Sequence, residues 1–210
     1  MENVASPPAQ LATVTIPEGI DIGACTAKES SRYAIAGTLI RVQGERAVAV
    51  ATDGKCMSLT RLETLMPGNW EGIVPTDALP SRTECTGRKI HPRTLTLNGT
   101  VQRTDAKGRN VTLPPSEGTF PRYADVVPEY LTEDCTVIRL NIDLLASIAH
   151  AIASPDIGKV RAVTVMVPHK YGKPIGVIGN NGIGVVMPIG HNGNKEECDR
   201  FNEQRSSLTK

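Results

Sequence analysis

Residues 46–62 read R-A-V-A-V-A-T-D-G-K-C-M-S-L-T-R-L, and this stretch indicates the fold class. Apolar and polar or small residues alternate along Arg46–Thr52, which is typical of a half-buried strand. Asp53-Gly54 is a strong hairpin-turn signal, and Cys56–Leu62 alternates again as a returning strand. Ile35–Val42, just upstream, predicts a further strand. The stretch therefore predicts a three-stranded antiparallel meander.

The same meander recurs twice further along the chain. Each time, a short strand and a helical segment precede three strands, and the period is roughly 55–60 residues. The strands expected in chain order cover residues 12–16, 35–42, 46–52, 56–62, 70–75, 93–97, 100–104, 109–113, 136–140, 161–167, 174–178 and 183–189. In each unit the helix should cover one face of the sheet, and the units should continue into one another edge to edge.

One segment has a clear helical pattern. Ile142–Ala153 places its apolar residues on one helical face, Asn141 or Asp143 can cap its start, and Pro155 ends it. The apolar face consists of Ile142, Leu145, Ile148, Ala149 and Ile152. This helix precedes the last group of three strands.

The helices of the first two units are expected to be short. Gly23 weakens any helix in Ile20–Ser31, and Pro80 limits a helix capped by Thr76-Asp77 to one or two turns. Strands therefore greatly outnumber helices. The sequence predicts an α+β fold of three consecutive βαβββ half-domains, with antiparallel sheets and few, short helices.

The composition excludes several classes of protein. Lys and Arg number 23 against 22 Asp and Glu, so the balance implies no global attraction to nucleic acid or to an anionic membrane. No apolar run is long enough to span a membrane, and the first ten residues do not resemble a secretory signal. The five cysteines include no C-x-x-C pair, which favours reduced thiols in a cytoplasmic protein.

Motifs for catalysis are absent from the sequence. It contains no G-x-S-x-G, H-E-x-x-H or phosphate-binding G-x-x-x-x-G-K-[ST] pattern, and its four histidines are scattered. Gly179–Gly184 (G-N-N-G-I-G) lies between two expected strands, so it indicates a hairpin turn rather than an anion-binding loop at a helix N-terminus. We therefore expect no enzymatic activity, no cofactor and no metal.

Three segments carry a more specific signal together. Val50–Met57 reads V-A-T-D-G-K-C-M, Glu117–Pro128 reads E-G-T-F-P-R-Y-A-D-V-V-P, and Gly184–Ile189 reads G-V-V-M-P-I. In this order they resemble the V-A-T-D-G-H-R-L turn, the G-x-F-P-D-Y-x-x-V-L-P connector and the Y-V-V-M-P-M ending of the bacterial DNA polymerase III beta subunit family, the sliding clamps. The segment Ser31–Leu39 fits the same family, whereas Lys55-Cys56 replaces its His-Arg.

The resemblance implies a domain organisation. Clamp domains consist of two βαβββ halves, and this chain would contain three halves. Residues 12–127 would form one domain similar to the middle clamp domain, and 128–190 would form the second half of the last domain. Residues 1–11 would be a flexible arm, and 191–210 a polar tail that is either a short surface helix or disordered.

The resemblance also implies a docking site. In sliding clamps, a hydrophobic pocket between the middle and last domains binds short peptides of polymerases and repair factors. The residues that match it here are Thr52, Gly54, Lys55, Met57, Pro121, Val126, Val185, Val186, Met187, Pro188 and Ile189. Apolar walls, a deformable Met side chain and a Gly that permits close approach suit an extended peptide with apolar anchors. The alternative interpretation is that the Val and Met residues are ordinary core.

Encirclement of DNA is the second role that the family implies. It requires basic residues near the helical segments, and the candidates are Lys28, Arg32, Arg82, Arg88 and Lys159. Twelve halves close a clamp ring, so four copies of this chain would be needed. The leading hypothesis is a non-enzymatic, sliding-clamp-like protein that binds DNA or replication and repair proteins. The alternatives are a peptide-binding adaptor without a ring, or an unrelated β-rich interaction protein.

Overall fold

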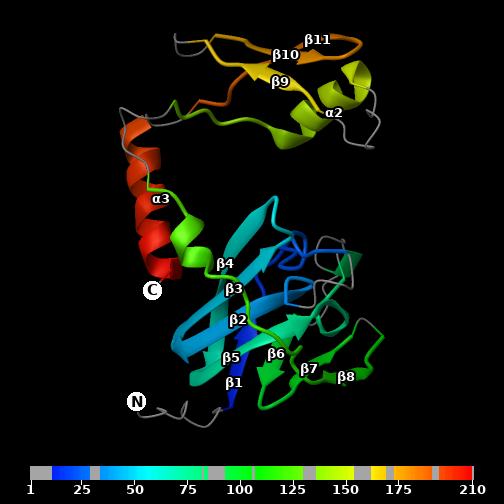
Figure 1. The fold of residues 1–210 in the computed structure, drawn as a ribbon, viewed down its shortest axis with the longest axis vertical. Coiled ribbons are helices and arrows are strands. Elements are labelled where there is room, and N and C mark those ends of the chain that lie inside the picture. Colours follow the sequence, from blue (N-terminus) through cyan, green and yellow to red (C-terminus); the bar gives the residue numbers. More distant parts are fainter. Residues whose placement is uncertain are drawn as a thin grey trace. The chain divides into compact units, whose positions relative to one another are not determined.

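The computed structural model describes residues 11–28, 34–81, 83–84, 93–105, 107–129, 136–153, 162–168, 173–190 and 194–209 (Figure 1). The chain divides into two compact units. Unit 1 comprises Met1–Val127 with Ser206–Lys210, and unit 2 comprises Pro128–Arg205. Within the described residues, no helix is both long enough and apolar enough to span a membrane.

Unit 1 contains one antiparallel sheet of eight strands, with the order β5-β2-β3-β4-β1-β6-β7-β8 (Figure 1). The strands are β1 (Ala12–Thr15), β2 (Gly37–Gly44), β3 (Arg46–Thr52), β4 (Met57–Met66), β5 (Gly68–Pro75), β6 (Thr94–Leu97), β7 (Val101–Thr104) and β8 (Asn110–Leu113). The sequence predicted all eight. β4 extends beyond the predicted end at Leu62 to Met66, because its last residues pair with β1.

The two halves of unit 1, β1–β4 and β5–β8, exchange their first strands. β5 pairs with β2 of the first half along its whole length, from Gly37↔Pro75 to Gly44↔Gly68. In the same way β1 pairs with β6 of the second half, and it also pairs with β4 of its own half. After β8, the amide of Ser116 donates to the carbonyl of Ile73 at 2.7 Å, so β5 also contacts its own half. The two halves therefore share one sheet with a repeated pairing pattern.

The main core of unit 1 lies on the inner face of this sheet. Its members are fully buried and come from both halves: Ala12, Val14, Ile16, Ile22, Ile40, Val42, Ala47, Ala49, Leu62, Trp70, Val74, Ala78, Leu79, Leu95, Leu97 and Val101. Ile22 lies in a series of turns, and Ala78 ends the 3-10 helix η1 (Thr76–Ala78). Both lie between the first and second strands of their halves, where the sequence predicts curtailed helices. The segments at the helix positions therefore fill the space between the two halves.

The outer face of β2–β5 carries a second, smaller cluster. Leu39, Val50 and Ile73 are buried there under Tyr123. Tyr123 belongs to the connector that follows β8 and lies in its 3-10 helix η2 (Tyr123–Val126). The connector therefore covers this face of the sheet.

Unit 2 contains a three-stranded antiparallel sheet with the order β11-β10-β9. The strands are β9 (Thr164–Met166), β10 (Ile175–Gly179) and β11 (Gly182–Val186). The helix α2 (Ile142–Ile152) packs on β10 and β11. The polar tail forms α3 (Asn194–Thr209), which belongs to unit 2 up to Arg205 and to unit 1 from Ser206. The sequence predicts that the three half-domains continue into one another edge to edge. This is correct for the two half-domains of unit 1. It is wrong for the third, because the described strands of unit 2 form a separate sheet.

The expected strand at Thr136–Leu140 is reduced to one bridge. Arg139 pairs with Ile189, and the amide of Ile189 donates to the carbonyl of Arg139 at 2.8 Å. The helix that follows begins at Asn141, whose side-chain oxygen accepts hydrogen bonds from the amides of Asp143 and Leu144. Asn141 is therefore the N-cap residue, and Asp143 occupies the first turn, where the helix dipole favours an acidic side chain.

Two glycines allow α2 to lie close to the sheet. A Cβ atom on Gly184 would collide with the side chain of Ile148, and one on Gly179 would collide with the backbone of Ile152. Strand glycines commonly mark such a close approach. The same glycines that made G-N-N-G-I-G resemble a phosphate loop therefore serve helix packing.

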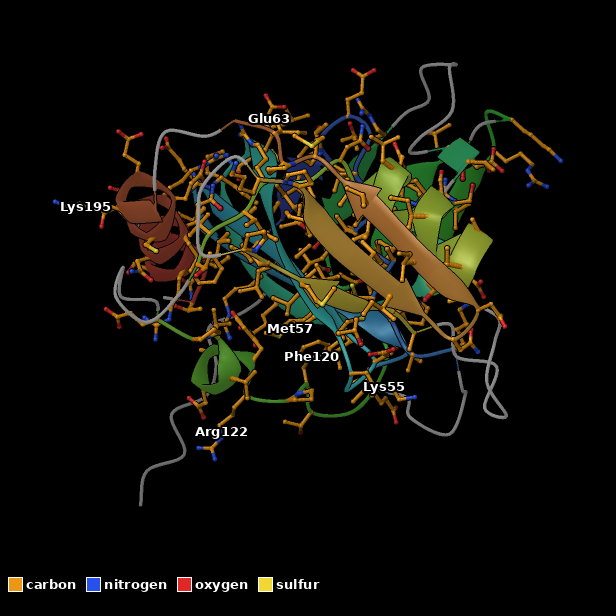
Figure 2. The ribbon with its side chains drawn as sticks, turned by 90° about the horizontal axis from the view of Figure 1, so that it is seen from above. Lys55, Met57, Glu63, Phe120, Arg122 and Lys195 are labelled. Atoms are coloured by element: carbon orange, nitrogen blue, oxygen red, sulfur yellow. The ribbon has the colours of Figure 1, made fainter. Side chains whose placement is uncertain are left out.

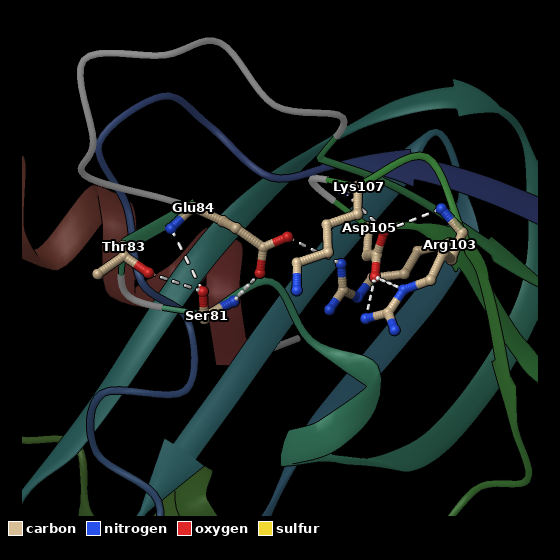
Figure 3. Close-up of polar contacts among 7 residues, drawn as sticks. Ser81, Thr83, Glu84, Arg103, Asp105 and Lys107 are labelled. Carbon is tan, nitrogen blue, oxygen red and sulfur yellow. Dashed lines mark hydrogen bonds and ion pairs between the residues drawn. The ribbon is translucent and has the colours of Figure 1, made fainter.

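The turn between β7 and β8 provides a prediction on pH dependence (Figure 3). Asp105 accepts hydrogen bonds from the amides of Lys107 and Arg109 at 2.8 and 2.9 Å, and from Arg109 Nε at 2.8 Å. The amide of Arg109, assisted by its side chain, lowers the pKa of Asp105 from 3.8 to about 2. A carboxyl with a lowered folded-state pKa stabilises the fold above its unfolded-state pKa, and this contribution is lost as the pH falls.

We therefore expect Asp105→Asn to destabilise the protein at neutral pH. The difference in the free energy of unfolding from the unmodified chain should stay constant down to about pH 4 and shrink between about pH 4 and 2. Urea unfolding at a series of pH values measures it. A difference that does not change over this interval would contradict the assigned role of the carboxylate.

Candidate peptide-docking site

The turn that joins β3 to β4 is held by its own side chains. Thr52 Oγ1 donates to the carbonyl of Cys56 at 2.7 Å and accepts from the amide of Gly54 at 3.1 Å. Asp53 Oδ1 accepts from the amides of Lys55 and Cys56, both at 2.8 Å. Gly54 has φ +85°, a conformation that a residue with a Cβ rarely adopts. These hydrogen bonds therefore fix the backbone of the turn at Thr52, Gly54 and Lys55, three of the residues predicted to bind a peptide.

The charges of this turn follow from its hydrogen bonds. The amides of Cys56 and Lys55 lower the pKa of Asp53, so its carboxylate is ionised at neutral pH. The hydrogen bond with Cys25 is the largest cause that raises the pKa of the Cys56 thiol, to about 11. The turn therefore presents a carboxylate, an exposed Lys55 (Figure 2) and a neutral thiol.

The next predicted residue, Met57, starts β4 and is half-buried. It packs with Phe120 of the connector against the outer-face cluster of unit 1 (Figure 2). Pro121 and Val126, the predicted connector residues, are exposed, and Val126 has 67% of its surface exposed. Unit 1 thus presents a polar turn, a half-buried apolar side chain and exposed apolar residues on the connector.

A groove of about 720 Å³ lies between the connector and strands β2 and β5. Leu39 and Ile73 contribute apolar surface, and Arg41 forms a two-point ion pair with Glu71 at 2.7 and 3.3 Å. The Arg41 guanidinium also lies 6.0 Å from the ring centre of Tyr123. Sequence reasoning missed this groove, because no local pattern relates Arg41 on β2 to Tyr123 of the connector, about 80 positions away.

In unit 2, the residues after Gly184 divide between core and surface. Val186 is 3% exposed and belongs to the core that faces α2. Val185, Met187 and Ile189 are exposed, with 61% and 58% exposure for the first two, and Pro188 is half-buried. Of the five predicted residues in this segment, Val186 is thus the one whose side chain the core takes up.

Sequence reasoning missed three further residues that are exposed beside Val185. Met166, Ile178 and Ile183 are exposed on β9, β10 and β11. The pairs Gly176↔Met166, Gly176↔Val185 and Ile178↔Ile183 place all of these side chains on the sheet face opposite α2. We call this face, formed by Met166, Ile178, Ile183, Val185 and Met187, the outer face of unit 2. Alternation along β11 was a signal that could have revealed it.

Most of the residues predicted to contact DNA lie outside the described part of the chain. Lys28 is exposed on unit 1, whereas Arg32, Arg82, Arg88 and Lys159 lie outside the described residues. Where side chains are described, no group of three His, Cys, Asp or Glu residues could hold a metal ion.

Comparisons with known proteins give matches among solved structures. A scan against family models found no match, and a search of curated proteins found none either. A DNA polymerase sliding clamp from Bacillus subtilis matches with 12% identity and a TM-score of 0.62, over 96% of this chain and 58% of that one. The sliding clamp from Pseudomonas aeruginosa matches with 16% identity and a TM-score of 0.63, over 94% and 58%.

A further match is informative because it contains a ligand. The sliding clamp (DNA polymerase III subunit beta) from Bartonella birtlesii, bound to griselimycin, matches with 18% identity and a TM-score of 0.57, over 85% of this chain and 51% of that one. The chain thus spans less than two thirds of the length of the clamps that it matches. The expected α+β, clamp-like fold is confirmed, and the chain has the fold of the bacterial DNA polymerase III beta sliding clamps.

Proposed function

We propose that the chain is a non-enzymatic, sliding-clamp-like protein that docks short peptides of replication or repair proteins. The proposed contacts are the turn Thr52–Met57, the connector residues Pro121 and Val126, and the segment Val185–Ile189. The observation that supports it most directly is the outer face of unit 2. Exposed apolar side chains grouped on one face of a sheet are typical of a surface that binds a partner.

The chemistry of these residues suits an extended peptide. Val185, Met187 and Ile189 offer apolar surface to the side chains of a partner, and Met adapts its shape to different anchors. At the turn, Lys55 can pair with an acidic group of the peptide, and Gly54 has no side chain to obstruct its backbone. These residue types favour a peptide with a few apolar anchors and a polar or acidic flank.

Titration of the full chain with two probes tests this proposal. One is a synthetic peptide with the clamp-binding type of motif, and the other is griselimycin, which is bound in two of the matched clamp structures. We expect saturable binding with a Kd in about the micromolar range, measured by calorimetry, and competition between the two probes. No saturable binding of either probe to the folded chain would overturn the proposal.

Encirclement of DNA by four copies is the second candidate, and the clamp fold is what favours it. Sizing with and without nicked circular DNA separates it from the adaptor hypothesis. A ring should have four times the monomer mass of 22.5 kDa and be retained on circular but not on linear DNA. A protein that binds peptides and ignores DNA would support the adaptor instead.

A further inference from the structure

We propose that unit 2 completes its fold by pairing with unit 2 of a second copy of this chain. Unit 1 contains two complete halves with a repeated pairing pattern. There, the second strand of each half, β2 or β6, pairs on one side with its own meander and on the other with the first strand of the opposite half. Each half therefore needs a first strand from another half.

Within its described residues, unit 2 has the elements of one half. Residues 136–140 hold the place of the first strand, α2 follows, and β9–β11 form the meander. The bridge Arg139↔Ile189 repeats the bridge Ile73↔Ser116 of unit 1, because both join a first strand to the residues that follow the last strand. β9 corresponds to β2 and β6. Among the described strands it pairs only with β10, so its other edge lacks the partner that β2 and β6 have.

The core of unit 2, between its sheet and α2, is small. Sixteen buried residues form the core between the halves of unit 1, whereas the core cluster described for unit 2 has three, Ile175, Val177 and Val186. No residue of α2 is fully buried, and Ile142 and Leu144 are 69% and 54% exposed. In unit 1, by contrast, Ile22 and Leu79 at the helix positions are buried between the halves. A small unit with so little buried apolar surface is marginal by itself.

The chain itself narrows the choice of partner to a second copy. The part of the chain that the structure describes contains three first strands. Two of them are already engaged on both sides: β1 by β4 and β6, and β5 by β2 and Ser116. The third, 136–140, contacts the end of β11, which is separated from β9 by β10. It cannot also reach the open edge of β9 in the same copy. The first strand that fits this edge is therefore 136–140 of another copy.

A two-fold axis satisfies both copies at once. Segment 136–140 of each copy would pair with β9 of the other, and the two α2 helices would lie between the sheets. The strand order would then repeat that of unit 1, and the contact would be isologous, as in most homodimers. Ile138 and Leu140 already face the core side with Val163, so the paired edges would extend one apolar layer. The net charge of +1 offers little repulsion between copies.

Sedimentation of the full chain over a range of concentrations tests the proposal. We expect a dimer with twice the 22.5 kDa monomer mass, and protection of β9 amides from hydrogen exchange that increases with concentration. A monomer well above micromolar concentrations would overturn the proposal. A monomer whose β9 amides are protected would also overturn the proposal, because another part of the same chain would then cover the edge of β9. One such part is α3, which borders a hollow of about 490 Å³ beside residues 136–138.

Two double variants test which face of unit 2 forms the dimer contact. Ile142→Asp with Leu144→Asp puts two charges on α2 in its first turn, where acidic residues favour the helix, so the unit should still fold. It should weaken dimerisation about 100-fold. The matched control, Ile183→Asp with Val185→Asp, puts the same charges on the outer face and should leave the dimer intact. An intact dimer in the α2 variant, together with a weakened dimer in the outer-face variant, would overturn the proposal. Peptide titration of both variants separates this result from the docking function.

Discussion

A Met187→Glu variant should fold normally and lose peptide docking by about 100-fold or more. Met187 is 58% exposed, so the free protein can carry a charge at this position in water. A docked peptide would remove that water and leave the carboxylate against apolar groups. An unpaired, desolvated carboxylate costs several kcal/mol, roughly, which exceeds what a single apolar anchor contributes. The measurement is a titration with the same peptide that binds the unmodified chain.

Met66→Glu is the matched control for this experiment. Met66 ends β4, is 37% exposed and lies outside the proposed contacts, so the same substitution there should leave the affinity unchanged. Unchanged affinity in a folded Met187→Glu variant would count against the site. Equal losses in both variants would indicate a general effect of charge or stability and would also count against it.

Local patterns in the sequence predict most of the strands of this fold. Alternation predicts β3 at its observed bounds, and the helical period predicts α2 with an end one residue too late. Both depend on neighbouring residues, which is what such patterns report. For α3, sequence reasoning left a short surface helix and a disordered tail open, because this segment has no apolar period. Its residues Glu197 and Arg200 instead form an ion pair one turn apart.

The exchange of first strands could not be predicted. β1 and β6 are about 80 residues apart, and a pairing over such a distance leaves no local signal in either strand. The same holds for the candidate site. The sequence indicated which residues of the turn and the final segment to examine, but not that Val186 faces the core or that Ile183 has 78% of its surface exposed. Those outcomes depend on which sheet face α2 covers.

Trp70→Ala should be the most destabilising of the substitutions proposed for unit 1. Trp70, the only tryptophan of the chain, is 4% exposed, lies opposite Val42 on β2 and belongs to the core between the halves. Removing a buried indole typically costs about 3–5 kcal/mol, a large share of the about 5–15 kcal/mol that stabilises a domain. Urea unfolding followed by far-UV circular dichroism measures this. Leu65→Ala, at a side chain 55% exposed, should change stability by less than about 0.5 kcal/mol.

A substitution at Gly72 tests the packing of the Trp70 indole from the neighbouring position on β5. A Cβ on Gly72 would lie 2.8 Å from the Cη2 atom of Trp70, so the missing side chain makes room for the indole. Gly72→Ala alone should therefore cost about 1–3 kcal/mol through overpacking. In the Trp70→Ala background the ring is gone, and the added methyl group should become neutral or stabilising. This double-mutant cycle should yield a coupling energy of about 1–3 kcal/mol, and additive effects would show that the indole does not occupy the space above Gly72.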